Sequence, residues 1–230
     1  MSASRTYGQF CGVSRAADLL GQRWALHIVR DLLIAPARFS DLLRALPGVP
    51  TNMLSTRLRE LEAAGVVERQ AVPGQRSVQY RLTARGRGLE PVIDALGRWG
   101  AGRMVAPEPG ETVTSAIVAS MLRTAFAGRA EPGPTTTTVF QVGGGPVAAW
   151  AEVTGEDIVV GDGEHTRPDL LIVAGPAMRA FLAGELTPTE FAAAPGVTVT
   201  GPVPLLELFS RLFRLPFDLA LEEQRNEKQR

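Results

Sequence analysis

The stretch RFSDLLRALPGVPTNMLSTRLRELEAAGVVERQAVPGQRSVQYRL, residues 38–82, decides the fold of the first part of the chain. Leucines recur at helical spacing before Pro47 and Gly48, which end a first short helix. A second helix is predicted over residues 51–64, because its leucines keep this spacing and a glycine follows where a C-terminal cap belongs. Hydrophobic and polar residues then alternate on both sides of a turn at 73–76, which predicts a β-hairpin. Two short helices followed by a hairpin form a winged helix-turn-helix.

The second of these helices is the one that a helix-turn-helix inserts into the major groove of DNA. If Leu54 points inward, a step of about 100° per residue turns the polar side chains of Asn52 and Arg59 outward. Such side chains can hydrogen-bond to base edges or phosphates. The candidate DNA-binding residues, the last two at the tip of the hairpin, are Arg38, Thr51, Asn52, Ser55, Thr56, Arg57, Arg59, Gln75 and Arg76. An amphipathic helix with a solvated polar face, beside a plain exposed hairpin, is the alternative.

Charge is distributed unevenly along the 230 residues, although the formal net charge is zero. Residues 1–105 hold 15 arginines and 8 acidic residues, whereas residues 106–230 hold 9 basic and 16 acidic residues. The first part is therefore basic enough to meet phosphates, and the second part is expected to have a different partner. Prolines and glycine predict a linker at 107–110, which separates domains of residues 1–106 and 111–230.

The composition argues against several other classes of protein. The chain has one cysteine, Cys11, so no internal disulfide can form, which fits a reducing, cytoplasmic compartment. No apolar run approaches the roughly 18 residues that cross a membrane, and the polar N-terminus shows no signal peptide. The two histidines, His27 and His165, lie far apart, and no residue spacing indicates a metal site, a cofactor or a catalytic nucleophile. The sequence therefore does not predict an enzyme.

The first 105 or so residues resemble the HxlR-type winged helix-turn-helix transcription regulators. The stretches that carry the resemblance are CGVSRAADLLGQRWALHIVRDLL at 11–33, RFSDLLRALPG at 38–48, MLSTRLRELEAAGVVER at 53–69 and YRLTARGRGLEPVIDALGRWG at 80–100. The resemblance implies double-stranded DNA binding as a homodimer, with the terminal helices of the domain forming much of the contact between subunits. A two-fold dimer would face a pseudo-palindromic operator with half-sites about one helical turn apart.

Two positions in this region carry specific expectations. The family pattern usually has serine where this chain has Pro50, so we expect Thr51 to cap the recognition helix and to start it one residue later. Cys11 corresponds to a cysteine near the start of many family members, which in some relatives senses oxidants or electrophiles. Helix proximity and Arg15 would lower the pKa of Cys11 and favour a redox-sensitive thiolate. A half-buried thiol that packs at the dimer contact is the alternative.

The second part of the chain alternates short strands with helices. Strands are predicted over residues 135–142, 147–153, 158–160, 170–173 and 197–200. A helix start is predicted at Thr187, because threonine caps helices, proline suits the first helical position and Glu190 lies three residues on. The last helix, which follows Pro202, is apolar on more than one face, so it is expected to line a pocket, fill one or join a dimer interface.

This order resembles the lipid-binding type-two sterol carrier protein fold. The resembling residues are PDLLIV at 168–173, LAGELTP at 182–188 and VTVTGPVPLL at 197–206. The resemblance implies a small mixed sheet with helices on one side and an apolar cavity for a lipid-like molecule. The candidate ligand-binding residues are Phe140, Trp150, Phe181, Leu206 and Phe209. Ordinary core packing is the alternative for each of them.

We therefore expect an α+β protein in which a winged helix-turn-helix domain precedes a sterol-carrier-like α+β domain. Its predicted function is that of a dimeric, DNA-binding transcription regulator, a repressor, whose second domain senses a small apolar ligand. In one alternative the second domain only dimerises. In another the chain is a lipid carrier, or an enzyme acting on a bound lipid, whose first domain contacts proteins.

Overall fold

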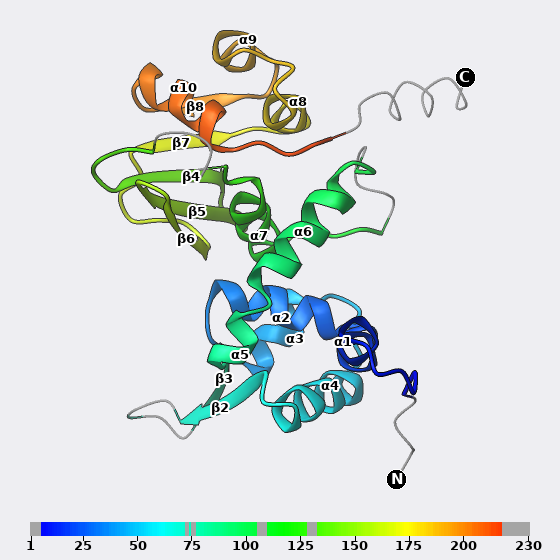
Figure 1. Ribbon diagram of the computed structural model, residues 1–230. Helices are drawn as coiled ribbons and strands as arrows, with labels where there is room; N and C mark the ends of the chain where they lie inside the picture. The colour runs from blue at the N-terminus through cyan, green and yellow to red at the C-terminus, as the bar shows by residue number, and fades with distance from the viewer. Residues whose placement is uncertain (1–5, 72–73, 75–76, 105–109, 128–132, 218–230) are drawn as a thin grey trace. The chain divides into compact units, whose positions relative to one another are not determined.

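The computed structural model describes residues 6–71, 74, 77–104, 110–127 and 133–217. The chain divides into two compact units, Met1–Ile93 and Asp94–Arg230, which we call unit 1 and unit 2 (Figure 1). The division falls inside a helix, α6 (Glu90–Ala101). Except for Gly110, the predicted linker at 107–110 lies outside the described residues, so the predicted domain limits stay a prediction.

Unit 1 consists of short helices packed on a three-stranded sheet. Its helices are α1 (Gly12–Leu20), α2 (Ala25–Ile34), α3 (Phe39–Ala45), α4 (Thr51–Ala63) and α5 (Ala84–Arg87). The strands β1 (Ala37–Arg38), β2 (Val67–Ala71) and β3 (Val78–Leu82) form an antiparallel sheet in the order β1-β3-β2. The order α3, α4, β2, β3 confirms the predicted winged helix-turn-helix.

Leucines from the predicted helix faces form the core of unit 1. Leu42, Leu54 and Leu58 are at most 1% exposed, and each buried leucine contributes about 1.5–3 kcal/mol to stability. The turn from α4 into β2 depends on Gly65, whose φ of +68° is a left-handed conformation that residues with a Cβ rarely adopt. The amide of Val66 then donates to the carbonyl of Leu61 at 2.9 Å, which closes the helix end as expected.

The start of α4 differs from the expectation. Thr51 was expected to cap the helix, but the N-cap is Pro50, with φ −67° and ψ 139°, and Thr51 is the first helical residue. The prediction was wrong because proline already has the φ that the extended cap position needs, and the helix makes no use of an amide hydrogen there. Consequently no side chain caps α4, and Thr51 lies within its first turn.

Unit 2 contains a five-stranded sheet with the strand order β6-β5-β4-β7-β8. The strands are β4 (Thr138–Gly144), β5 (Val147–Thr154), β6 (Asp157–Asp162), β7 (Leu170–Val173) and β8 (Thr198–Thr200). The helices that follow α6 are α7 (Ser115–Ala125), α8 (Ala177–Ala183), α9 (Pro188–Ala192) and α10 (Val203–Leu212). Of the strand pairs in the described part of this sheet, only β4 and β7 run parallel, so the sheet is mixed, and the α+β class is confirmed.

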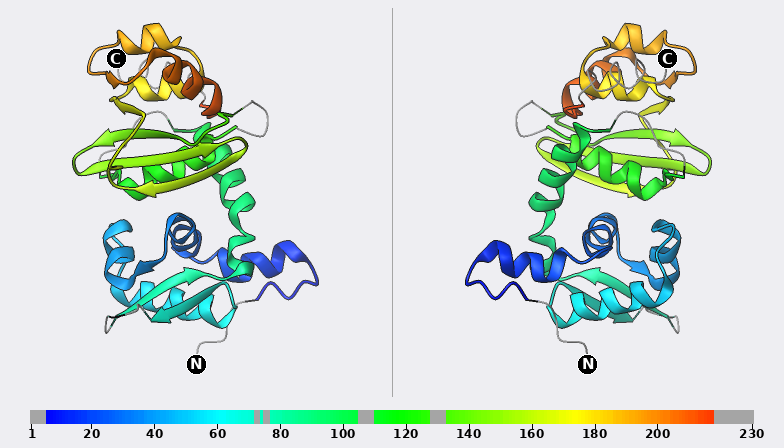
Figure 2. Two further views of the ribbon diagram at one scale, coloured as in Figure 1. Left: turned by 90° about the vertical axis from the view of Figure 1, so that its left-hand side faces the viewer. Right: turned by 90° about the vertical axis from the view of Figure 1, so that its right-hand side faces the viewer.

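The two faces of this sheet differ in burial. Phe140 on β4 pairs with Ala151 on β5 and with Leu170 on β7, and all three are fully buried. Helix α7 packs against β5 and β6, while α8, α9 and α10 lie together near β7 and β8 (Figure 2). On the opposite face Val159 is 58% exposed. The core of unit 2 therefore lies on the Phe140 face.

Candidate nucleic-acid interface

Helix α4 turns its polar side chains away from the core, as the sequence predicts. Leu54, Leu58 and Leu61 are at most 1% exposed. Thr51, Asn52 and Arg59 are exposed, and Ser55 and Thr56 are partly exposed. The inward leucines fix the rotation of the helix, so these polar residues are the ones that a bound duplex could reach.

The polar side chains of α4 are ordered along the helix by hydrogen bonds. Arg59 donates from Nε to the carbonyl of Ser55 and from Nη2 to Oγ1 of Thr56, both at 3.3 Å. Thr56 donates to the carbonyl of Asn52 at 2.9 Å. The guanidinium of Arg59 therefore lies along the helix toward Asn52, so that hydrogen-bond donors gather on one side of α4. We call this side, which carries Asn52, Thr56 and Arg59, the exposed stripe.

The side chain of Arg57 is more buried than that of Arg59. Its side chain is 13% exposed and pairs with the carboxylate of Glu60, one helical turn away. One of its guanidinium nitrogens also lies 3.7 Å from the sulfur of Met53. Because its charge is met within the helix, Arg57 is less available to a bound duplex than the exposed Arg59.

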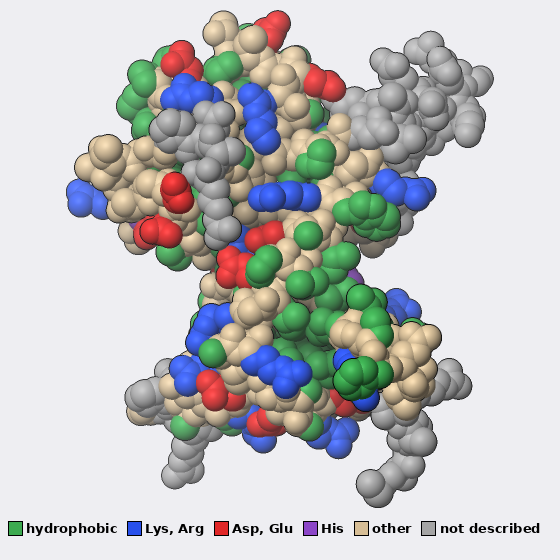
Figure 3. Space-filling model, in the orientation of Figure 1, with side chains coloured by type: hydrophobic (Ala, Val, Ile, Leu, Met, Phe, Trp, Pro, Cys, Tyr) green, Lys and Arg blue, Asp and Glu red, His purple; other side chains and the backbone are tan. Residues whose placement is uncertain are grey.

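Arg38 lies where β1 ends and α3 begins. It is exposed, and its backbone amide donates to Oδ2 of Asp41 at 3.1 Å, which fixes the start of α3. Helix α4 and the β2–β3 hairpin lie together at the lower edge of unit 1 (Figure 1), where basic side chains are visible in Figure 3. The predicted contacts at the tip of the hairpin, Gln75 and Arg76, lie outside the described residues.

Sequence reasoning missed one arginine of this hairpin. The guanidinium carbon of Arg69 lies 5.9 Å from the ring centroid of Tyr80, its partner across the two strands. The signal that could have found it is the register of the hairpin, since a turn at 73–76 sets residues 69 and 80 opposite each other. An arginine beside a tyrosine on a wing is a candidate contact in its own right.

Cys11 is an exposed free thiol at the N-cap of α1. Hydrogen bonds from the backbone amides of Ser14 and Val13 and from the Ser14 hydroxyl hold the pKa of Cys11 below its ordinary value. The start of the helix, rather than the charge of Arg15, is responsible for this shift. The thiol is exposed rather than half-buried within this chain, which favours reactivity.

We expect Cys11 to be alkylated at lower pH in the native protein than in the unfolded chain. Only the thiolate reacts, so a lowered pKa moves the midpoint of the rate–pH curve downward. Mass spectrometry of iodoacetamide-treated protein in buffer and in urea measures both midpoints, because the chain has a single cysteine. Coinciding native and unfolded midpoints would contradict the expectation.

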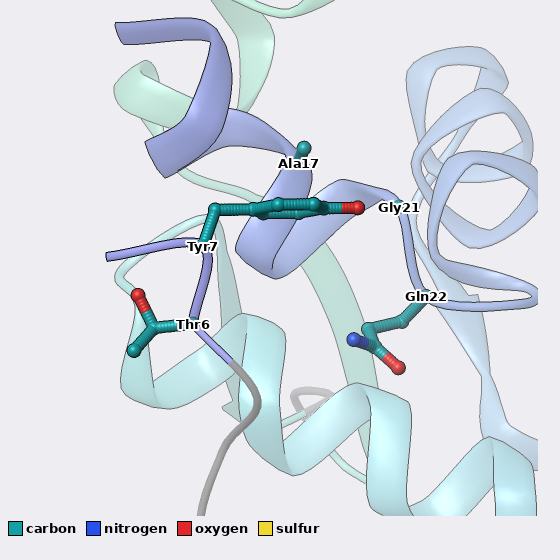
Figure 4. Close-up of a pocket in the computed structure, with 5 residues that line it drawn as sticks. All are labelled: Thr6, Tyr7, Ala17, Gly21 and Gln22. Carbon is teal, nitrogen blue, oxygen red and sulfur yellow. The ribbon is translucent and has the colours of Figure 1, made fainter. Parts of the chain in front are cut away.

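A depression lies beside α1, and none of the predicted DNA-contact residues is among the residues that line it. It is lined by Thr6, Tyr7, Ala17, Gly21 and Gln22 (Figure 4). The carboxylate of Asp18 holds the N-terminal segment over the helix, because it accepts from the hydroxyl of Thr6 at 3.0 Å and from the amide of Tyr7 at 2.9 Å. No charged side chain lines it, so it carries none of the chemistry of phosphate recognition.

The candidate ligand residues of unit 2 are not all brought together. Phe140, Phe181, Leu206 and Phe209 are at most 3% exposed, and the three phenylalanine rings contact one another or Phe213. Trp150 lies on the other face of the sheet, because it alternates with Ala151 along β5. Its ring covers Gly161, where a Cβ would collide with the indole, and packs edge-on against His165 at 5.3 Å.

The described part of the chain has neither a metal-binding cluster nor a membrane-spanning helix. Within it, no group of three or more His, Cys, Asp or Glu side chains is arranged to hold a metal ion. None of the helices in the described ranges is long and apolar enough to cross a membrane.

Comparison with known proteins bears directly on the exposed stripe of α4. The family model described as HxlR-like helix-turn-helix matches residues 19–107. An HTH-type transcriptional regulator of Synechocystis sp. is 39% identical over 95 residues, which are 41% of this chain and 70% of that protein. The chain belongs to the HxlR-like helix-turn-helix family. YvaP of Bacillus subtilis, another HTH-type transcriptional regulator, is 40% identical over 37% of this chain and 80% of its own length.

A third relative is the HTH-type transcriptional regulator YodB of Bacillus subtilis, 38% identical over 99 residues, which are 43% of this chain and 86% of that protein. The family match ends at residue 107, so it includes α4 and the hairpin and leaves most of unit 2 unmatched. The homologous proteins are named as transcription regulators, which agrees with the prediction that the HxlR-like chain is not an enzyme.

Proposed function

We propose that the protein is a dimeric transcription repressor that binds a pseudo-palindromic operator through α4. The observation that carries the proposal is the exposed polar stripe of α4 in a chain of the HxlR-like family. The proposed base and phosphate contacts on this helix are Thr51, Asn52, Ser55, Thr56 and Arg59, with Arg57 as a weaker member. We propose that Arg38, Gln75 and Arg76 add contacts to the DNA backbone.

The test is binding of the full chain to duplex DNA from the promoter region of its own gene across a salt series. A scrambled duplex of equal length is the comparison, because non-specific binding depends on phosphates alone. The proposal predicts tighter binding to one pseudo-palindromic segment at every salt concentration. Equal binding to both duplexes would overturn it.

Exposed hydrophobic side chains near α1 support the homodimer. Tyr7, Phe10 and Val13 are each more than 60% exposed, and Phe10 is fully exposed. Hydrophobic side chains also gather near α1 in Figure 3. At the other end of the family domain, Leu96 and Trp99 of α6 are exposed too. Large exposed apolar residues commonly mark protein interfaces, so we propose that α1 and α6 contact a second copy.

Replacing Phe10 with glutamate is expected to weaken the homodimer by at least about 3 kcal/mol, or roughly 150-fold. Removing a phenylalanine side chain from an interface forfeits about 1.5–3 kcal/mol of burial, and two-fold symmetry counts the change twice. Sedimentation equilibrium measures the dissociation constant. Val203→Glu is the matched control, since Val203 is an exposed valine of unit 2. If only Val203→Glu splits the dimer, the contact lies in unit 2 and the alternative of a dimerising second domain gains support.

For unit 2 we propose a sterol-carrier-like domain that senses a small apolar or lipid-like ligand. The mixed sheet with its buried face under helices supports this, because the resemblance of residues 168–206 implies that arrangement. Control of DNA binding requires that the ligand prefer one dimer conformation over the other. Operator affinity of the protein with and without a long-chain fatty acid tests the switch. Equal affinities would remove the sensor role and leave DNA binding intact.

A further inference from the structure

The register of the β2–β3 hairpin divides its side chains between two faces. Val67 pairs with Leu82, and both are 2% exposed, so the face that carries them turns toward the core. Two residues further along each strand, the same face carries Arg69 and Tyr80. Beyond them Val78, on the same face, is exposed. The hairpin face that carries Arg69 is therefore buried at its Val67 end and exposed toward the tip of the wing.

The guanidinium of Arg69 lies over an aromatic ring and not beside a carboxylate, with its central carbon 5.9 Å from the ring centroid of Tyr80. Tyr80 is partly buried and packs against the core of unit 1, while Arg69 is exposed. Among the residues that the structure describes, Arg69 forms no ion pair. Stacking on a ring orients the plane of a guanidinium but leaves the N–H groups along its edges available to an acceptor.

Arg81 on the same hairpin is in the opposite situation. It lies on the other face, and its Nε is 2.7 Å from a carboxylate oxygen of Glu68, its cross-strand partner. Both side chains of this pair are partly exposed. The two arginines occupy neighbouring positions in the strand register, but the charge of Arg69 lies over a tyrosine ring and that of Arg81 is paired with a carboxylate.

We propose that Arg69, positioned by Tyr80, contacts a phosphate of the DNA backbone next to the groove that α4 occupies. The inference rests on the proposed function and adds a third DNA contact to those proposed for α4 and for the tip of the wing. The guanidinium of Arg69 has a planar set of donors that suits phosphate oxygens, and the hairpin lies beside α4 at one edge of unit 1 (Figure 1). A phosphate contact carries no sequence information, so Arg69 sets the position of the wing rather than the choice of operator.

The experiment compares the salt dependence of DNA binding among matched variants of the full chain. Each binds a fluorescently labelled duplex from the promoter region of its own gene between about 50 and 200 mM NaCl. Loss of one phosphate contact makes the negative slope of log K against log salt less steep by about 0.9, so Arg69→Ala should bind about eightfold more weakly at about 0.1 M salt. Arg81→Ala should keep the wild-type slope.

The role of Tyr80 is tested by two substitutions that differ only in keeping the ring. Tyr80→Phe should retain the wild-type slope, and Tyr80→Leu should shift the slope toward that of Arg69→Ala. Circular dichroism melting checks that each variant is folded. A wild-type slope for Arg69→Ala, or an equal loss for Arg81→Ala, overturns the inference and leaves the proposed function standing. Wild-type protein that binds neither the promoter duplex nor a scrambled one overturns both.

Discussion

Replacing Arg59 with alanine is expected to weaken operator binding by about 1–3 kcal/mol, or roughly 5- to 150-fold, if the guanidinium reads a guanine. Arg59 is exposed on the outer face of α4, and its two bonds to Ser55 and Thr56, each 3.3 Å, hold the guanidinium along the helix. A pre-oriented guanidinium loses less side-chain freedom on binding than a mobile one. Fluorescence anisotropy with the promoter duplex and with its single-base variants measures the loss.

The scrambled duplex separates the two kinds of contact that Arg59 can make. If Arg59 meets only a phosphate, the loss is the same on both duplexes and the salt slope falls by about 1. Arg44→Ala is the matched control on α3, because Arg44 is an exposed arginine already paired with Asp41 at 3.3 Å. Unchanged affinity and slope for Arg59→Ala would remove Arg59 from the proposed interface.

Helical periodicity explains how far the interface could be predicted from the sequence. The spacing of Leu54, Leu58 and Leu61 fixes which side of α4 is buried, so Asn52 and Arg59 could be placed on the exposed side without coordinates. Periodicity says nothing about what an outward side chain contacts. That Arg57 turns to Glu60 while Arg59 extends along α4 depends on the packing of individual side chains.

Motifs whose hydrogen bonds join residues only a few positions apart could also be predicted from the sequence. The capping box at Thr187 is confirmed: its Oγ1 accepts from the amide of Glu190 at 3.2 Å, and a Glu190 oxygen accepts from the amide of Thr187 at 2.8 Å. The predicted cap of α4 was wrong because Thr51 and Pro50 were both candidates for the N-cap. Thr51 has the side chain that can cap a helix, but Pro50 has the backbone conformation of the cap position.

The arrangement of the strands in unit 2 could not be predicted from the sequence, because it depends on contacts between residues that are far apart in the chain. Each strand was predicted from its own residues, but the parallel pairing of β4 with β7 joins segments about 30 residues apart. The relation of Trp150 to Phe140 depends on this sheet, because their faces follow from the register of β4 and β5. Grouping the two as walls of one pocket by their aromatic character therefore placed side chains together that the sheet separates.

Phe209→Ala is expected to destabilise unit 2 by about 3–5 kcal/mol. Phe209 on α10 is fully buried, and its ring centroid lies 4.5 Å from that of Phe213 and 5.7 Å from that of Phe140. Deleting the ring removes its burial and leaves a cavity that the neighbouring rings cannot fill without leaving their rotamers. Amide hydrogen exchange in β4, followed by mass spectrometry, measures the free energy of opening of unit 2 without treating the two units as one transition.

Two comparisons turn this measurement into a test of what the phenylalanine cluster is for. Val203→Ala on the same helix should cost little, because Val203 is exposed, and Phe209→Leu should cost less than Phe209→Ala, because most of the volume is kept. A core residue obeys this order in the absence of any ligand. If Phe209 instead lines a lipid site, Phe209→Ala should cost less than about 1 kcal/mol and change the affinity for a fluorescent fatty acid, because a ligand-filled wall is not fully packed in the free protein. The full loss with unchanged probe binding would assign Phe209 to the core and move the search for a ligand site to other residues of unit 2.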